Sequence, residues 1–231
     1  MAQWYAKPSG GYSLSSNEAK NNMDMIYSVF SSQGYTLEAI SAIIGNMNNE
    51  SAMNPWRWQE DRVVYSAGYG LIQFTPASGY IYLTGVPNHA PNLSTSAQTS
   101  GASPNDGYAQ CDVIYNDRLN KWVNNIWRDY WSTSSYPTEY AYMQELRNTY
   151  GRYISQDTFK TITDLKAATF IFNGGYVGEL VLNFNPRYAD AQTAYAYLSG
   201  HEPPEPPEPP VPPTPTPSRK LPIIFYLRYP F

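Results

Sequence analysis

The strongest constraint on the fold of this chain is a helix that is apolar along one face and ends at a carboxylate. Its apolar residues recur at helical spacing from Leu37 to Met47, and Glu50 falls beside Ile43 on the border between this stripe and solvent. Asn54 and Pro55 then end the helix, because proline disfavours the helical conformation in the residue before it. We therefore predict a buried helix that organises the fold and carries Glu50 in its last turn.

Two effects of that position act on the carboxyl group of Glu50 in the same direction. The unpaired carbonyl groups at the C-terminus of a helix disfavour a negative charge, and partial burial does the same. We expect both to raise the pKa of Glu50, and a carboxyl group that keeps its proton near neutral pH can serve as a general acid. The alternative is a surface glutamate that happens to end a helix.

The composition excludes several other kinds of site. The 231 residues carry a net charge of −4 and show no basic patch, so we expect no nucleic-acid partner. Cys111 is the single cysteine, and His89 and His201 lie far apart in loop-like sequence. We therefore expect no intrachain disulfide, no metal site, no other cofactor and no histidine-dependent nucleophile.

Aromatic residues are abundant, with 22 Tyr and 6 Trp. Rings with polar edges suit both a core and a surface that binds sugars or proteins. No stretch approaches the ~20 apolar residues that span a bilayer, so we expect no membrane span. Residues 1–5 lack the basic and apolar regions of a secretory signal. We expect no signal peptide, and delivery by another route if the protein acts outside the cell that makes it.

Helical patterns flank the central helix on both sides in the sequence. Ser15 and Glu18 form a capping box that begins a first helix, which runs to about Ser31. Thr36 caps the central helix, and a further helix is predicted from Cys111 to Ile126. Three more helices are predicted over about residues 138–150, 163–172 and 185–200.

Residues 62–74 have a different character and predict a small β-hairpin. Arg62–Tyr65 and Leu71–Phe74 have strand-like sequence, and the glycine-rich turn Ser66–Gly70 joins them. Residues 86–107 are rich in Pro, Asn, Ser and Gly, and they predict a long loop insertion. The predicted fold class is therefore α+β, with a mostly helical lobe and a small β-hairpin lobe that form a cleft.

The composition divides the chain into four parts. Residues 1–14 are predicted to be an N-terminal arm, and residues 15–200 to be one domain. Residues 201–217 are a proline-rich linker that favours polyproline II and reaches roughly 45 Å. Residues 218–231 are apolar and too short to span a membrane, and we predict a docking peptide. The alternative is that this tail folds back onto its own domain.

Two motifs, Ile44–Pro55 with its Glu-Ser pair and Gly68–Pro76 with its Gly-Leu-x-Gln stretch, carry a resemblance to a known family. Leu14–Pro76 resembles the phage tail lysozyme family, within the lysozyme and lytic transglycosylase superfamily. Residues 108–199 match more loosely, mainly through Asn185–Ala191, which also opens the last helix with an N-cap and a proline. The resemblance implies a lysozyme-like fold.

The resemblance also implies cleavage of the β-1,4 bond between N-acetylmuramic acid and N-acetylglucosamine in peptidoglycan, with Glu50 as the general acid. A glycosidase usually needs a second carboxylate, and Asp61 is the favoured candidate, ahead of Glu60. The alternative is that both are solvated turn residues. Glu50 then acts alone, first as acid and then as base, as in lytic transglycosylases, and gives an anhydro product.

The remaining candidate site residues are expected to contact the sugar: Ser51, Trp58, Tyr69, Gln73, Asn173 and Tyr176. Ser51 can orient the Glu50 carboxylate or contact an acetamido group, and Gln73 can bind sugar hydroxyls. Trp58 and Tyr69 can stack on sugar rings, although burial is the commoner outcome for such rings. The stretch from Asn173 to Tyr176 resembles a third transglycosylase motif, but a plain C-cap explains it equally well.

These features together predict a muramidase carried in a phage virion, on the tail, that opens the wall locally for DNA entry. Its partners are peptidoglycan glycan strands and, through residues 202–231, one or more tail proteins. Two other functions remain open. One is a wall-binding module that has lost catalysis, and the other is a mainly structural tail-tip protein.

Overall fold

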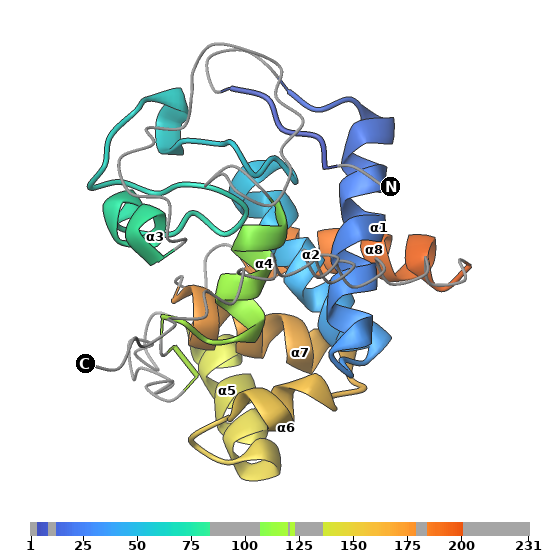
Figure 1. The fold of residues 1–231 in the computed structure, drawn as a ribbon. Helices are drawn as coiled ribbons and strands as arrows, with labels where there is room; N and C mark the ends of the chain where they lie inside the picture. The colour runs from blue at the N-terminus through green and yellow to red at the C-terminus, as the bar shows by residue number, and fades with distance from the viewer. Residues whose placement is uncertain are drawn as a thin grey trace, which may run out of the picture.

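A computed structural model of the chain describes residues 4–8, 13–83, 107–119, 121–122, 136–178 and 184–200. This part of the chain is built from helices, shown in Figure 1. The α-helices are α1 (Ser16–Ser32), α2 (Leu37–Ser51), α3 (Ala77–Leu83), α4 (Gly107–Tyr115), α5 (Pro137–Tyr150), α6 (Gln156–Lys160), α7 (Leu165–Ile171) and α8 (Phe184–Leu198). A 3-10 turn, η1 (Gln59–Asp61), and a π-helix, η2 (Phe172–Val177), complete the described elements.

Helix α2 lies at the centre and packs against α1, α7, α8 and η2. Thr36 caps it as predicted, because its side chain accepts a hydrogen bond from the backbone N–H of Ala39. The closest neighbour is α8, which crosses α2 in Figure 1. Gly45 allows this approach, since a Cβ atom there would lie 2.5 Å from the carbonyl oxygen of Arg187 and 2.7 Å from the Cβ of Ala191.

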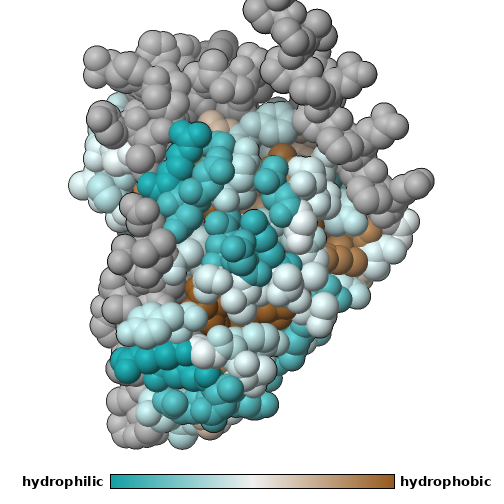
Figure 2. All heavy atoms as spheres, turned by 60° about the horizontal axis from the view of Figure 1, so that its bottom comes forward, coloured by the Kyte–Doolittle hydropathy of each residue, from teal (hydrophilic) through white to brown (hydrophobic). Residues whose placement is uncertain are grey.

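The surface helices turn their few apolar residues inward. In α5 only Met143 and Leu146 are buried. On the face shown in Figure 2, which brings the lower part of Figure 1 forward, hydrophilic side chains predominate and hydrophobic ones reach the surface in small areas. Helix α5 therefore has the one-sided burial expected for the outer layer of a domain.

Several predicted helices are confirmed, and the differences lie at their ends. Helix α1 begins with the predicted capping box of Ser15 and Glu18. The helix predicted from Cys111 to Ile126 instead ends at Tyr115, and the turn that follows contains Asp117 with φ 46°. The predicted C-cap at residues 173–175 is also wrong, because these residues continue α7 as the π-helix η2, which ends at Val177 and is capped by Gly178 with φ 82°.

The predicted β-hairpin, and with it the α+β fold class, is wrong, because the described residues contain no strand. Only isolated bridges join Trp58 to Tyr69 and Tyr69 to Phe74. Gly70 and Gln73 have φ angles of 78° and 51°, which break the extended conformation that a strand requires. The aromatic side chains of this segment pack into the core, and its backbone does not pair as strands. The helices around it agree with the predicted helical lobe.

Three other predicted segments lie almost entirely outside the described residues. The loop insertion at residues 86–107 falls outside the described residues except for Gly107, which begins α4. The linker at 201–217 and the tail at 218–231 also lie outside them.

Residues 4–8 lie along the domain and are held by two buried asparagines. Asn22 accepts a hydrogen bond from the N–H of Tyr5 (2.9 Å) and donates to the carbonyl groups of Tyr5 (2.8 Å) and Met53 (2.9 Å). Asn54 accepts from the N–H of Lys7 (3.1 Å) and donates to its carbonyl group (2.8 Å). Each asparagine amide therefore hydrogen-bonds to both the N–H and the carbonyl group of one residue in this segment, as the backbone of a neighbouring strand would. Both contacts lie next to the turn that ends α2.

We predict that Asn54→Ala lowers the free energy of unfolding by about 2–3 kcal/mol, because it leaves several buried backbone groups without a partner. The measurement is urea unfolding followed by circular dichroism. Asn17→Ala is the matched control, since Asn17 is exposed in the first turn of α1. Equal stability of the two variants would contradict the role of Asn54 in holding residues 4–8.

Candidate active site

A pocket of about 700 Å³ lies between the segment that follows α2 and the helical part of the domain. Its lining is mixed, with acidic, basic and aromatic side chains around the end of α2. The residues that line it are Glu50, Arg57, Trp58, Gln59, Glu60, Ile72, Gln73, Phe74, Thr75, Pro76, Gly79, Tyr80, Leu119, Lys121 and Val177. Its size and its mixture of apolar and convergent polar groups are typical of a ligand-binding pocket.

Glu50 reaches the pocket from the last turn of α2 and forms an ion pair there with Arg187 of α8. Its Oε1 atom lies 2.5 Å from Nη2 of Arg187, and the two side chains are only 12% and 2% exposed. Nη1 of Arg187 also approaches the backbone and side-chain oxygens of Asn46, at 3.4 and 3.3 Å. The carboxylate of Glu50 is thus fixed from behind, on the side away from the pocket.

This ion pair adds an influence that the sequence did not predict. The guanidinium group of Arg187 favours the charged form of Glu50, whereas partial burial and the end of α2 favour the neutral form. A ligand that excludes water or moves the arginine would change the balance between these effects.

Arg187 contacts the candidate site through Glu50, although the sequence analysis assigned it no role there. A signal was present, since Arg187, Ala191, Ala194 and Leu198 recur on one face of α8 and all four are buried. An arginine on the apolar face of a helix needs a buried partner of opposite charge. Glu50, also placed beside an apolar stripe, was the matching carboxylate.

Gln73 lines the pocket on the side formed by the segment after α2. Its Nε2 atom donates to the carbonyl groups of Gly70 (3.0 Å) and Arg57 (3.3 Å). Its Oε1 atom is buried and has no hydrogen-bond partner. A buried amide oxygen without a partner is costly unless a ligand supplies a donor, such as a hydroxyl or an amide N–H.

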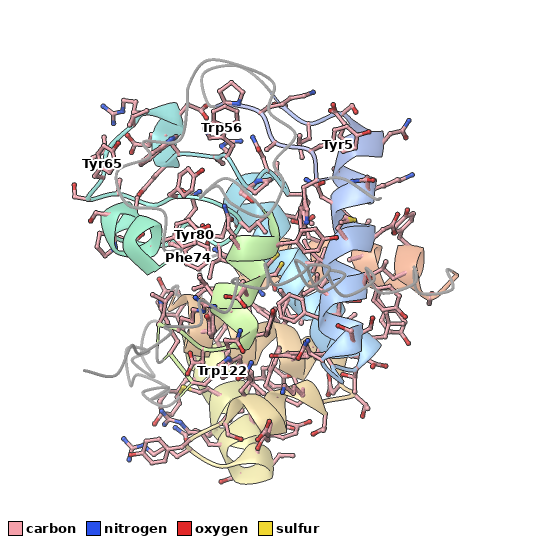
Figure 3. All side chains as sticks on the ribbon, viewed as in Figure 1. Tyr5, Trp56, Tyr65, Phe74, Tyr80 and Trp122 are labelled. Atoms are coloured by element: carbon pink, nitrogen blue, oxygen red, sulfur yellow. The ribbon has the colours of Figure 1, made fainter. Side chains whose placement is uncertain are left out.

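Aromatic rings form much of the same wall. Phe74 and Tyr80 stack at 4.4 Å between ring centroids, and Figure 3 shows them side by side. Trp58 also lines the pocket, although it is fully buried as a residue. Tyr69 lies behind this wall, in contact with Trp58 and Tyr80, and does not line the pocket. Burial raises the pKa of Tyr69 well above its usual value, so its hydroxyl group stays neutral.

The two carboxylates considered for the second catalytic role lie in different places. Asp61 is outside the pocket lining, is about two-fifths exposed, and has its Oδ1 atom 3.4 Å from Nε of Arg57. Glu60 lines the pocket and forms an ion pair with Arg62. Among the described acidic residues, only Glu50 and Glu60 therefore face this space.

Ser51, Asn173 and Tyr176 are buried and do not line the pocket. The hydroxyl group of Ser51 lies 3.0 Å from the carbonyl oxygen of Met47 and 3.1 Å from that of Leu71. It therefore ties the end of α2 to the segment that carries Gln73. Asn173 and Tyr176 belong to η2, and their neighbour Val177 is the residue that reaches the pocket.

Two further features bear on the site. No group of three or more His, Cys, Asp or Glu side chains that could hold a metal ion occurs among the residues described by the structure. In the same part of the chain, no helix has the length and apolar character needed to cross a membrane.

A helical domain whose central helix ends at a carboxylate on a pocket wall agrees with the lysozyme-like helical lobe that the two motifs imply. The sequence matches the phage tail lysozyme family over residues 21–198, and the chain belongs to that family. The resemblance noted from the two sequence motifs is thereby confirmed. Morphogenesis protein 1 of Bacillus phage B103 is 41% identical over 69 residues, which cover 29% of this chain and 19% of that protein. The chain thus spans less than two thirds of that relative.

We predict that Arg187→Met lowers the free energy of unfolding by about 3–5 kcal/mol, because it leaves the carboxylate of Glu50 partly buried without its cation. Combining it with Glu50→Gln is expected to restore part of that loss, since both charges are then absent. Chemical denaturation of the single and double variants measures this coupling. Strictly additive losses would show that the pair does not act as a unit.

Proposed function

We propose that this protein is a phage tail muramidase that cleaves the β-1,4 bond between N-acetylmuramic acid and N-acetylglucosamine, with Glu50 as the general acid. The observation that carries the proposal is the position of Glu50, at the end of the central helix and on the wall of the pocket. Membership of the phage tail lysozyme family supports a peptidoglycan-degrading enzyme. The particular bond and the location on the tail are part of the proposal.

Each group of the pocket has a place in this reaction. Substrate in the pocket excludes water and favours the protonated form of Glu50, which then protonates the glycosidic oxygen as the bond breaks. Arg187 holds the carboxyl group in place and stabilises the carboxylate that remains. The unpartnered Oε1 of Gln73 accepts a hydrogen bond from a sugar hydroxyl or acetamido group. Phe74 and Tyr80 offer an aromatic surface beside the sugar rings.

The reaction has two routes, which differ in whether a second carboxylate takes part and which give different products. Glu60 on the pocket wall is better placed than Asp61 to assist water or to act as a nucleophile. If neither carboxylate takes part, Glu50 acts as acid and then as base, the 6-hydroxyl group of muramic acid attacks in place of water, and the product is an anhydro sugar. The first route is hydrolysis and the second is lytic transglycosylation.

We further propose that residues 202–231 attach the enzyme to a neighbouring tail protein. The support is compositional, because a stiff proline-rich spacer followed by an apolar peptide suits docking at a distance. A phage morphogenesis protein among the relatives agrees with a place in the virion. A wall-binding module without catalysis and a purely structural tail-tip protein are the rival functions, and both are distinguished by the variants below.

We predict that Glu50→Gln lowers the clearing of peptidoglycan in a zymogram and in a turbidity assay by at least about 100-fold, because a general acid contributes roughly that factor or more. Glutamine keeps the shape of the side chain and a hydrogen bond to Arg187. Asp157→Asn, on an exposed side chain far from the pocket lining, is the control. Equal clearing by wild type and Glu50→Gln would refute the mechanism, and binding to the wall without clearing by either would favour the binding module.

Mass spectrometry of the products identifies the route taken. Reducing-end muramic acid indicates hydrolysis, and anhydromuramic acid indicates transglycosylation. Intact glycan with cut peptides would exclude both. The same products from Glu60→Gln and Asp61→Asn then show whether either carboxylate takes part, since loss of the second group slows hydrolysis and leaves transglycosylation unaffected.

We predict that deletion of residues 202–231 leaves glycan cleavage by the purified protein unchanged and abolishes its incorporation into virions. The reason is that the deleted segment follows the family match, which ends at residue 198. Immunoblotting of purified particles measures the incorporation, and Glu50→Gln in the full chain is the control for assembly. Normal incorporation of the truncated protein would rule out the docking role.

A further inference from the structure

The pocket has two cationic side chains, and they come from different parts of the chain. Arg57 lies in the segment after α2, next to Trp58, and Lys121 lies in the turn that follows α4, near Leu119. Neither belongs to the ion pair that holds Glu50. Two positive charges from separate segments therefore reach the same cavity, and the reaction described above uses neither of them.

The turn that carries Lys121 is fixed by the fold. The carboxylate of Asp117 accepts hydrogen bonds from the backbone N–H groups of Lys121 (2.7 Å) and Trp122 (3.1 Å). The ring of Trp122 is buried against Phe159 and Tyr176, with centroid distances of 4.9 and 5.2 Å, and Figure 3 places it in the lower part of the domain. This anchor presents Lys121 at the pocket from the helical side.

Arg57 is fixed through its backbone, while its side chain is free to change partners. Its carbonyl group accepts hydrogen bonds from the N–H of Gly70 (2.8 Å) and from Nε2 of Gln73 (3.3 Å). Its side chain is about one-third exposed and contacts Asp61 at 3.4 Å. An exposed pair of this kind contributes little stability, so a ligand carboxylate can replace Asp61 at small cost.

The acidic residues of the lining are each paired with a cation that does not line the pocket. Glu50 is paired with Arg187, and Glu60 is paired with Arg62. Arg57 is paired in the same way with Asp61, which does not line the pocket, and the Nζ atom of Lys121 lies 6.0 Å from the centroid of the Tyr176 ring. Beside its carboxylates, the pocket therefore presents two cationic groups, from separate segments, that a negatively charged part of a ligand can contact.

We propose that Arg57 and Lys121 bind carboxylates of the substrate, so that the pocket selects glycan strands that carry acidic peptides over uncharged N-acetylglucosamine polymers. The inference rests on the proposed function and names the part of the substrate that these residues recognise. Peptides attached to muramic acid carry free carboxylates, whereas a chain of N-acetylglucosamine alone carries none. Arginine and lysine bind carboxylates through charge-assisted hydrogen bonds.

The test compares the full-length protein on solubilised peptidoglycan strands before and after their carboxylates are converted to amides with carbodiimide and ammonia. For wild type, the KM is expected to rise about three- to tenfold on the neutralised strands, as two modest charge contacts are lost, with little change in kcat. For the double variant Arg57→Gln/Lys121→Gln, the KM on native strands is expected to rise by the same factor and then to respond little to neutralisation.

Lys20→Gln is the matched control, because Lys20 is exposed on α1, near the ring of Tyr197, and does not line the pocket. It is expected to behave as wild type on both substrates. An unchanged KM of wild type on neutralised strands, or equal sensitivity of the double variant, would overturn the proposal. If wild type cleaves neither substrate, the proposed function fails separately, and sedimentation binding of both kinds of strand to Glu50→Gln still tests the carboxylate contacts.

Discussion

The buried ion pair between Glu50 and Arg187 links the two helices on which this domain depends. It joins the end of α2 to the start of α8, which lie 137 positions apart in the sequence. Breaking one half of such a pair is costly, so the fold and the chemistry of the carboxyl group are coupled. The same contact that holds the two helices together places a cation beside the carboxyl group of Glu50.

A second set of buried polar contacts holds the wall that faces Glu50. Gln110 of α4 accepts a hydrogen bond from the N–H of Leu71 (2.7 Å) and donates to the carbonyl group of Pro55 (2.6 Å). Ser51 approaches the carbonyl group of Leu71 from α2. A segment without strands can therefore keep a defined shape, because side-chain amides and hydroxyls take the place of a sheet.

The sequence predicted the elements with local signals and missed those that depend on distant contacts. The capping box at Ser15 and the apolar stripe of α2 are local, and both predicted helices are present. The hairpin was wrong because Gly70 and Gln73 adopt positive φ angles that residue type alone does not dictate. Glu50 was singled out by its place at a helix end, whereas Arg187 was missed, because its position on the apolar face of α8 indicates a buried partner and the packing of α8 on α2 supplies Glu50.

Gly45 gives the site a dependence on a residue that touches no ligand. The backbone of α8 lies so close to it that a single methyl group would collide with the carbonyl group of Arg187 itself. The close approach of the two helices thereby sets the distance between the guanidinium group of Arg187 and the carboxylate of Glu50, which lies further along α2. The absence of a side chain at position 45 therefore sets how closely Arg187 can approach Glu50.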